Sequence, residues 1–251
     1  MREMHEMLKN LIEQLHAAAG SELESVILYG SAADGDFQKH SDLNVLCVLR
    51  AVTADGLARV AGAVKWWKTV AKQPAPLFFT AAELRDSADV FAIEFLDMQR
   101  KHRVLYGSDP IAGLEIPMNL HRVQVEHELR TLLLKLRQQI VQAAMNQQEL
   151  AAVLGKATAS VATLLRHTLL AMGEQPPNEP RAVFARVAAR TGADPAAFHA
   201  MLNIREGEKH TGEVLSLYGA CMSAIEKVIA ALDRHLPKHE WQRGAKHGTA
   251  S

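Results

Sequence analysis

Two short apolar runs, separated by a turn and a polar stretch, constrain the fold of this chain most strongly. Residues 26–29 are β-branched or apolar and stop at the Gly-Ser pair of residues 30–31, as a buried strand ending in a turn does. A second apolar run, residues 45–49, begins just after Asp42 and Asn44. Side chains alternate along a strand, so Asp42 and Asn44 are expected to point the same way, about 7 Å apart. The pattern predicts a small polar site on an apolar sheet.

The residues of this polar site resemble a known family. They are similar to the Gly-Ser…Ser-Asp-x-Asp signature of the DNA polymerase β-like nucleotidyltransferase superfamily, which includes the minimal and the aminoglycoside nucleotidyltransferases. In that superfamily the Gly-Ser turn cradles nucleotide phosphates, and two Asp carboxylates hold Mg²⁺ ions over the α-phosphate. The resemblance implies contacts to the nucleotide from the turn and its surroundings, and metal ligands from the second strand. The motif is matched by Gly30-Ser31 with Gly35 and by Ser41-Asp42-x-Asn44. The resemblance assigns Gly30, Ser31 and Ser41 to the nucleotide, and Asp42 and Asn44 to Mg²⁺.

The sequence departs from the family at Asn44, where the family has a second Asp. A neutral amide still offers one oxygen to a metal, but it removes a negative charge from the site. Two functions therefore stay open. The first is transfer of a nucleoside monophosphate from a nucleoside triphosphate, with ATP as the favoured donor, to the hydroxyl of an unidentified acceptor. The alternative is a catalytically attenuated module that binds a nucleotide or a protein partner with the same fold.

Residues 90–98 are strongly apolar but contain two acids, Glu94 and Asp97. The run is predicted to be a strand, and it resembles the strand that carries a third carboxylate in aminoglycoside adenylyltransferases. The resemblance implies that Glu94 completes the metal site or acts as general base. A structural ion pair is the alternative for Glu94. Asp97 has the opposite parity, so on a regular strand it is expected on the other face, paired with Arg100 or Arg103; only a bulge would let it join Glu94 at the site.

Periodicity and turn signals predict the other elements of the first half. Apolar residues at helical spacing indicate helices, and short apolar runs bounded by Pro or Gly indicate strands. Thr80 and Glu83 have the spacing of a capping box, which predicts a brief helix to about residue 87. The predicted elements are a helix from about residue 4 to near Gly20, a helix over residues 53–72, and strands over residues 77–80 and 104–107.

From residue 119 onward the pattern is helical throughout, which predicts a bundle of four or five helices. The Pro- and Gly-bearing connection before it suggests a domain boundary. The predicted fold class is therefore α+β: a small mixed-sheet nucleotidyltransferase domain with helices on one face, followed by an all-α helical bundle. Bundles of this kind follow the catalytic domain in several nucleotidyltransferase families and form the far wall of the acceptor cleft. The predicted ranges are 1–112 for the first domain, 118–237 for the bundle and 238–251 for a disordered tail.

Composition limits the partners. Lys and Arg number 28 and Asp and Glu number 28, so no global charge draws the chain to long nucleic acid or to a membrane surface. No run of 18 apolar residues occurs, and we expect a cytoplasmic protein. The expected partners are a nucleotide and its acceptor, and the amphipathic first helix and the bundle leave room for a homodimer. The two cysteines, Cys47 and Cys221, are expected to be buried thiols.

Three further groups of residues have features of functional sites but are expected to lie in loops or on the surface. His40 precedes Ser41-Asp42 and is expected to be a loop residue, although it could touch a phosphate. Arg130 and Arg137 share a helix face and are expected to be exposed rather than directed into a cleft. Arg205 and His210 have the Arg-x4-His spacing of helical ribonuclease domains, but Gly207 between them suggests a helix junction.

Overall fold

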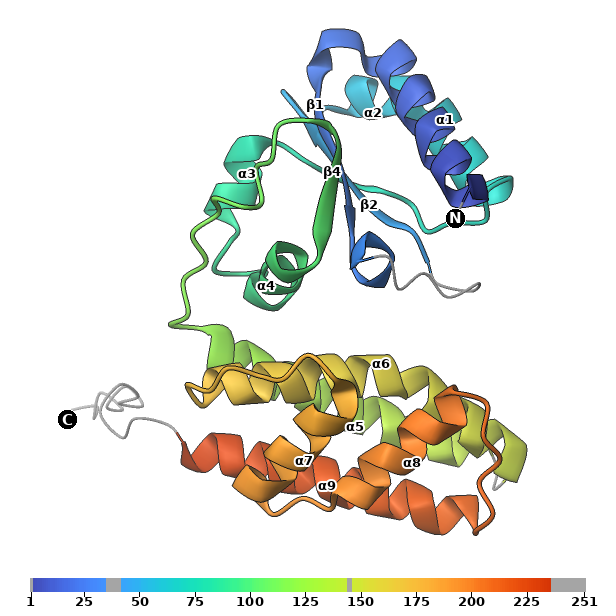
Figure 1. Ribbon diagram of the computed structural model, residues 1–251, viewed down its shortest axis with the longest axis vertical. Coiled ribbons are helices and arrows are strands. Elements are labelled where there is room, and N and C mark those ends of the chain that lie inside the picture. The colour runs from blue at the N-terminus through green and yellow to red at the C-terminus, as the bar shows by residue number, and fades with distance from the viewer. Residues whose placement is uncertain (1, 35–41, 144–145, 236–251) are drawn as a thin grey trace, which may run out of the picture. The chain divides into compact units, whose positions relative to one another are not determined.

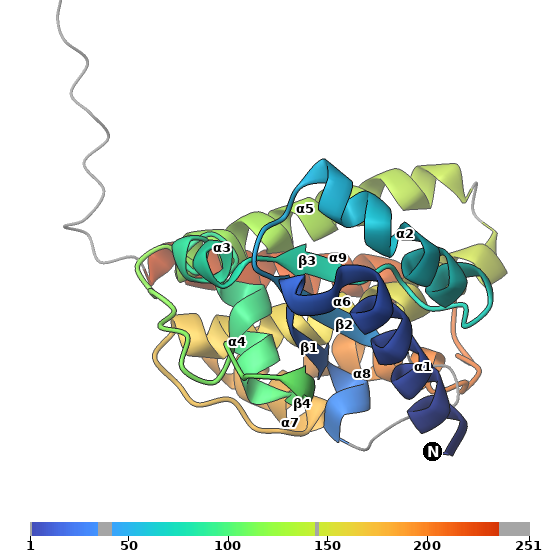
Figure 2. The same ribbon diagram turned by 90° about the horizontal axis from the view of Figure 1, so that it is seen from above.

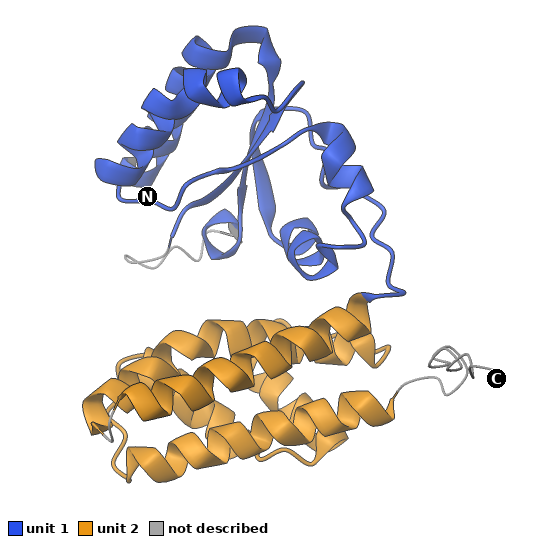
Figure 3. Ribbon diagram, turned by 180° about the vertical axis from the view of Figure 1, so that it is seen from behind, with its two compact units in different colours: residues 1–120 blue, residues 121–251 orange. Residues whose placement is uncertain are grey.

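The computed structural model describes residues 2–34, 42–143 and 146–235. It separates into two compact units, residues 1–120 and residues 121–251 (Figure 3). The sequence placed the boundary in the connection between residues 112 and 118. The predicted disordered tail, residues 238–251, lies outside the described residues.

The first unit contains a four-stranded sheet with helices around it (Figure 1). Thr80 caps the helix that follows it, because its hydroxyl accepts the N–H of Glu83 while the Glu83 carboxylate accepts the N–H of Thr80. This confirms the predicted capping box. The elements are α1 (Arg2–Ala19), β1 (Leu23–Tyr29), β2 (Asn44–Leu49), α2 (Ala54–Thr69), β3 (Leu77–Phe79), α3 (Ala81–Asp86), α4 (Ala92–Arg100) and β4 (His102–Gly107), with 3₁₀ turns η1 (Gly20–Glu22) and η2 (Ser31–Asp34).

The sheet is mixed, as predicted, with strand order β3-β2-β1-β4. β1 pairs antiparallel with both β2 and β4, whereas β3 pairs parallel with β2. Figure 2 shows β3 and β4 at opposite edges. β1 and β2 are therefore the central strands, which explains why their apolar runs are almost wholly buried.

Helices cover both faces of this sheet, so the prediction of helices on one face was wrong (Figure 1). Alternate residues of β2 separate into two cores, because side chains of a strand point to opposite faces. Val45 and Cys47 belong to the core under α1 and α2, and Leu46 and Val48 belong to the core under α3 and α4. The second face is covered because most of the predicted strand, residues 90–98, lies in helix α4 (Ala92–Arg100).

The second unit is a bundle of helices, as predicted. Its centre is α6, which packs against α5, α7, α8 and α9. Tyr218 of α9 is fully buried, and its hydroxyl donates to the carbonyl oxygen of Leu136 in α5 at 2.8 Å. The helices are α5 (His121–Gln142), α6 (Gln147–Ala171), α7 (Pro180–Thr191), α8 (Pro195–Arg205) and α9 (Val214–Arg234).

Among the described residues, helix α9 is long and apolar enough to cross a membrane by length and composition, with a mean hydropathy of 1.4. The core helix of a bundle meets the same criterion. Leu217, Cys221 and Ile225 of α9 are buried within the bundle, which accounts for the apolar character of the helix. Cys47 and Cys221 are both buried free thiols, and burial raises the pKa of each to about 12.

Candidate functional site

Polar groups gather where the end of β1 meets the beginnings of β2 and β4. Tyr29, the last residue of β1, is the cross-strand partner of Asn44 on one side and of His102 on the other. Antiparallel pairing thus brings three strand ends to the same end of the sheet. We call this region the polar sheet end, and it consists of Gly30, Ser31, Asp42, Asn44, Lys101 and His102.

Gly30 ties these strand ends together. Its φ of +81° lies in the left-handed region that favours glycine. Its N–H donates to the carbonyl oxygen of Lys101 at 2.9 Å, which joins the end of β1 to the start of β4. A Cβ on Gly30 would stand 3.4 Å from the side-chain nitrogen of Asn44, so the two residues face each other. Ser31 follows as an exposed residue at the start of η2.

Gln73, which the sequence analysis did not single out, holds the segment that leads into β2. Its Oε1 accepts the N–H of Leu43 at 2.8 Å, and its Nε2 donates to the carbonyl oxygen of Ala71 at 3.1 Å. Its own N–H donates to the carbonyl oxygen of Trp67 at 3.1 Å, which fixes its backbone to the end of α2. Leu43 is fully buried and Asp42 beside it is exposed. Gln73 therefore sets the path on which Asp42 leaves the core.

Replacing Gln73 by leucine is expected to lower the free energy of unfolding by about 1–2 kcal/mol, because the N–H of Leu43 loses its partner in a part-buried position. Urea denaturation followed by circular dichroism measures the change. Gln138→Leu, on an exposed position of α5, is the matched control. Equal stability of the two variants would show that the Leu43 contact contributes nothing.

Glu94 is not on a strand, which corrects the sequence prediction. It lies exposed in the first turn of α4. Ala92, Phe95 and Met98 are buried at helical spacing, and Ala, Leu, Met, Gln and Arg in this run favour a helix. Seven residues of helix separate Glu94 from Lys101, about 10 Å along the axis. Lys101, whose carbonyl oxygen accepts the Gly30 N–H, follows the opposite end of α4 from Glu94.

Asp97 is also helical rather than the end-of-strand acid that was predicted. It lies in α4 about one turn before Lys101, and its carbonyl oxygen accepts the Lys101 N–H at 3.1 Å. On the side of β2 away from β1 the neighbouring strand is instead β3, whose residues Leu77, Phe78 and Phe79 carry no acid. The fold therefore places no carboxylate on the neighbouring strand from which the family resemblance expected a third one.

The residues at the polar sheet end fit one magnesium ion better than two. Within the described ranges no three His, Cys, Asp or Glu side chains form a metal-ligand group. Asp42 supplies one carboxylate and Asn44 one amide oxygen. Proteins bind Mg²⁺ through one or two carboxylates together with substrate phosphates, so this pair suits an ion that arrives with a nucleotide. Two ions about 4 Å apart need more anionic ligands than Asp42 alone provides.

His102 and Asp109 brace the start of β4. The two ring nitrogens of His102 lie 2.9 Å from the carbonyl oxygen of Met98 and 3.0 Å from Asp109 Oδ2. Asp109 Oδ1 accepts the N–H groups of Ile111 and Ala112, each at 3.0 Å. Partial burial tends to raise the pKa of Asp109, but the hydrogen bonds from His102 and the two N–H groups outweigh it. The pKa of this carboxyl is therefore lowered.

This lowered pKa predicts a pH-dependent contribution to stability. A carboxyl whose folded pKa lies below its unfolded value of about 3.9 stabilises above that pH, and the effect disappears as the pH falls through the folded pKa. Asp109→Asn is expected to be less stable than the natural chain at about pH 6, with the difference becoming smaller as the pH falls below the unfolded pKa of about 3.9. Thermal unfolding across this range measures it, with Asp86→Asn as an exposed control. A difference that does not change with pH would contradict the assignment.

Three residues named in the sequence analysis lie outside the described residues: Gly35, His40 and Ser41. The structure thus brings the Gly30-Ser31 turn beside Asn44, with Asp42 two residues before it, and it places Glu94 on helix α4 rather than on a strand. Of the groups that the sequence analysis missed, Asp109 had a signal, because Asp before Pro commonly caps a turn. Gln73 and His102 had none, since their partners are distant in the sequence or set by the fold.

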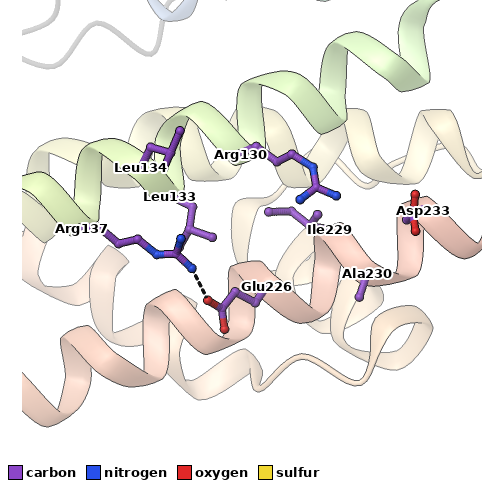
Figure 4. A pocket seen from close by; sticks show the side chains of 8 residues that line it. All are labelled: Arg130, Leu133, Leu134, Arg137, Glu226, Ile229, Ala230 and Asp233. Atoms are coloured by element: carbon purple, nitrogen blue, oxygen red, sulfur yellow. Dashed lines mark hydrogen bonds and ion pairs between the residues drawn. The ribbon is translucent and has the colours of Figure 1, made fainter.

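Arg130 and Arg137 lie in the bundle, along a groove of about 430 Å³ between α5 and α9 (Figure 4). Arg137 pairs with Glu226 at 2.7 Å, and Arg130 pairs with Glu126 on its own helix at 2.7 Å. Both arginines are exposed, as expected. Leu133 and Ile229 contribute apolar side chains to the same groove.

Arg205 and His210 do not share a helix face. Arg205 is the last residue of α8, and Gly207 follows with a φ of +92°. His210 lies in the connection to α9. The predicted helix junction is confirmed, and the ribonuclease spacing does not form a helical face.

Comparison with known proteins gives a match in structure only. No protein-family profile matches the sequence, and no protein of curated function is similar to it in sequence. The structure is similar to that of spectinomycin adenyltransferase AAD(9) from Enterococcus faecialis, crystallised with ATP and spectinomycin. The TM-score is 0.55 and the sequence identity 14%, over 91% of this chain and 99% of that chain. The chain therefore has an α+β fold of the nucleotidyltransferase type.

Proposed function

We propose that this protein binds a nucleoside triphosphate at the polar sheet end. The observation that carries the proposal is the juxtaposition of the Gly30-Ser31 turn with Asn44 and Asp42 at one end of the sheet, in a fold similar to that of a protein crystallised with ATP. The turn offers a hydroxyl and backbone N–H groups to phosphate oxygens. Asp42 would hold the Mg²⁺ that accompanies the triphosphate, with the amide oxygen of Asn44 as a second ligand.

Nucleotidyl transfer requires several positioned charged groups, and this site offers few of them, which favours binding over catalysis. In nucleotidyl transfer the acceptor oxygen bonds to the α-phosphorus, the bond to pyrophosphate breaks, and the acceptor proton passes to a base. Such a reaction depends on positioned charge. Asn44 is neutral, β3 carries no acid, and Glu94 lies at the other end of α4 from Lys101. We therefore propose a nucleotide-binding protein whose transfer activity is slow or lost.

Transfer to a small hydroxyl-bearing acceptor is the second candidate. It is favoured by the alternate spacing of Asp42 and Asn44, because with both side chains on one face they would offer two oxygen ligands to one metal near the Gly30 turn. Mg²⁺ bound there would neutralise phosphate charge. The equal numbers of acidic and basic residues give no field that would attract a long nucleic acid acceptor.

Calorimetric titration with ATP, GTP, CTP and UTP, each with and without Mg²⁺, tests the proposal. Binding that needs Mg²⁺ and is lost in Asp42→Ala, but is kept in the exposed control Asp86→Ala, is the expected result. The proposal is refuted if none of the four nucleotides binds at about millimolar concentration. A dissociation constant of about 1 mM corresponds to a binding free energy of about −4 kcal/mol. Release of pyrophosphate with a panel of hydroxyl acceptors would favour the second candidate.

A further inference from the structure

Strand β4 presents an open edge. It pairs with β1 on one side, and within the described parts of the chain no strand pairs with its other side. Figure 2 shows it at the border of the first unit, at the opposite edge of the sheet from β3. The outer N–H and C=O groups of an edge strand are a template for a further strand. β4 is six residues long, from His102 to Gly107, which is enough to pair with an extended segment.

A groove of about 520 Å³ lies between this strand and helix α1. Leu8 and Ile12 of α1 and Val104 and Leu105 of β4 form its apolar surface, and Leu8 is almost fully buried. The register between β1 and β4 is irregular at Val26–Ile27, next to Leu105. A bulge of this kind redirects a side chain, and Leu105 packs with the core under α1. An edge strand beside a helix is the arrangement in which PDZ domains receive an extended peptide.

The charged side chains around the groove carry a net positive charge. Lys9 and Arg103 are cationic and Glu13 is the one acid among the residues that line it. Lys9 lies 3.8 Å from Glu13, with both side chains largely exposed, so their pairing is weak. Arg103 is exposed on β4, and none of its described neighbours forms a salt bridge with it. An incoming segment with a carboxylate near Arg103 would complement this surface.

We propose that an extended segment of a partner protein pairs with the outer edge of β4 and packs its side chains between β4 and α1. The segment has apolar residues at alternate positions, which contact Ile12 and Leu105, and a carboxylate beside Arg103. A second copy of this chain is a poorer occupant. Pairing β4 with β4 across a two-fold axis would place no carboxylate opposite Arg103, because β4 contains no acidic residue.

Selection of displayed random peptides of about eight residues on the intact protein tests the proposal, since strands are typically of this length or shorter. Enriched sequences are synthesised, labelled and titrated by fluorescence anisotropy. The variants are Ile12→Glu and Arg103→Glu in the groove, with Arg59→Glu on the exposed side of α2 as control. Melting temperatures establish that each variant is folded.

Apolar-acidic alternation among the enriched sequences is the expected result. Arg103→Glu should weaken their binding about fivefold or more, exchange of the peptide carboxylate for lysine should restore it, and Arg59→Glu should change nothing. Methylation of the peptide backbone nitrogens that face β4 should abolish binding. The proposal is overturned if no sequence is enriched, or if the enriched peptides bind the groove variants as well as the natural chain. It is also overturned if sedimentation shows a dimer that Ile12→Glu dissociates, because a second copy then fills the groove.

Discussion

Replacing Gly107 by alanine is expected to lower the free energy of unfolding by about 3 kcal/mol, through strain and overpacking together. A Cβ at this position would lie 1.8 Å from the carbonyl oxygen of Glu24, which is backbone and cannot rotate away. The φ of Gly107 is +76°, which adds the cost of a left-handed conformation. Gly107 pairs with Ser25 at the end of β4, so relief of the contact would separate β4 from β1. Urea denaturation measures the loss.

Gly20→Ala is the control that separates the two causes. Gly20 also has a positive φ, +56°, but a Cβ there would meet nothing within 4 Å. Its replacement should cost only the conformational part, about 1–2 kcal/mol. If both variants lose the same stability, the close approach between Gly107 and Glu24 has no energetic importance.

Replacing Asn44 by aspartate is expected to change nucleotide binding in opposite directions with and without Mg²⁺. With Mg²⁺ present, a second carboxylate beside Asp42 should strengthen ATP binding about tenfold or more, since it adds an anionic ligand for a hard cation. With EDTA present, the added negative charge should weaken binding by repelling the triphosphate. Calorimetric titration of the natural chain and the variant under both conditions measures the two effects.

Asn44→Ala provides the comparison for this result. It should weaken Mg²⁺-dependent binding if the Asn44 oxygen contacts the ion, and it leaves the charge unchanged. Weaker binding of Asn44→Asp under both conditions would mean that Asn44 serves the site as an amide, and that a metal ion does not lie beside it.

The strands around the candidate site were predictable because their signals are local. The apolar runs of β1 and β2 and the intervening Gly-Ser pair form within about 25 residues, and the alternation of a strand fixes which side chains share a face. The same reasoning was wrong for residues 90–98, most of which lie in helix α4. An acid within an apolar run was interpreted as a buried strand residue, although Ala92, Phe95 and Met98 had helical spacing. The resemblance of the segment around Glu94 to a strand of the family was given more weight than the helical spacing of these apolar residues.

The contacts that position the site could not be predicted from local pattern. Gln73 lies 30 residues from Leu43, in a Pro-containing break that predicts only a loop. The partnership between His102 and Asp109 depends on where α4 ends and β4 begins, and the predicted strand over residues 90–98 had displaced that boundary. The covered second face of the sheet was missed for the same reason.

The hydrogen bond from the Leu43 N–H to Gln73 affects how fast the Leu43 amide proton exchanges with solvent during local unfolding. An amide proton exchanges with solvent only when its hydrogen bond opens, so the Leu43 amide reports the opening of the segment after α2 as well as that of β2. Fraying of α2 from its C-terminal end would therefore release the backbone beside Asp42 without unfolding the sheet. Slower deuterium uptake at Leu43 on ligand binding would show that a ligand at the polar sheet end stabilises the segment at the end of α2. Stabilising that segment must then strengthen ligand binding by the same free energy.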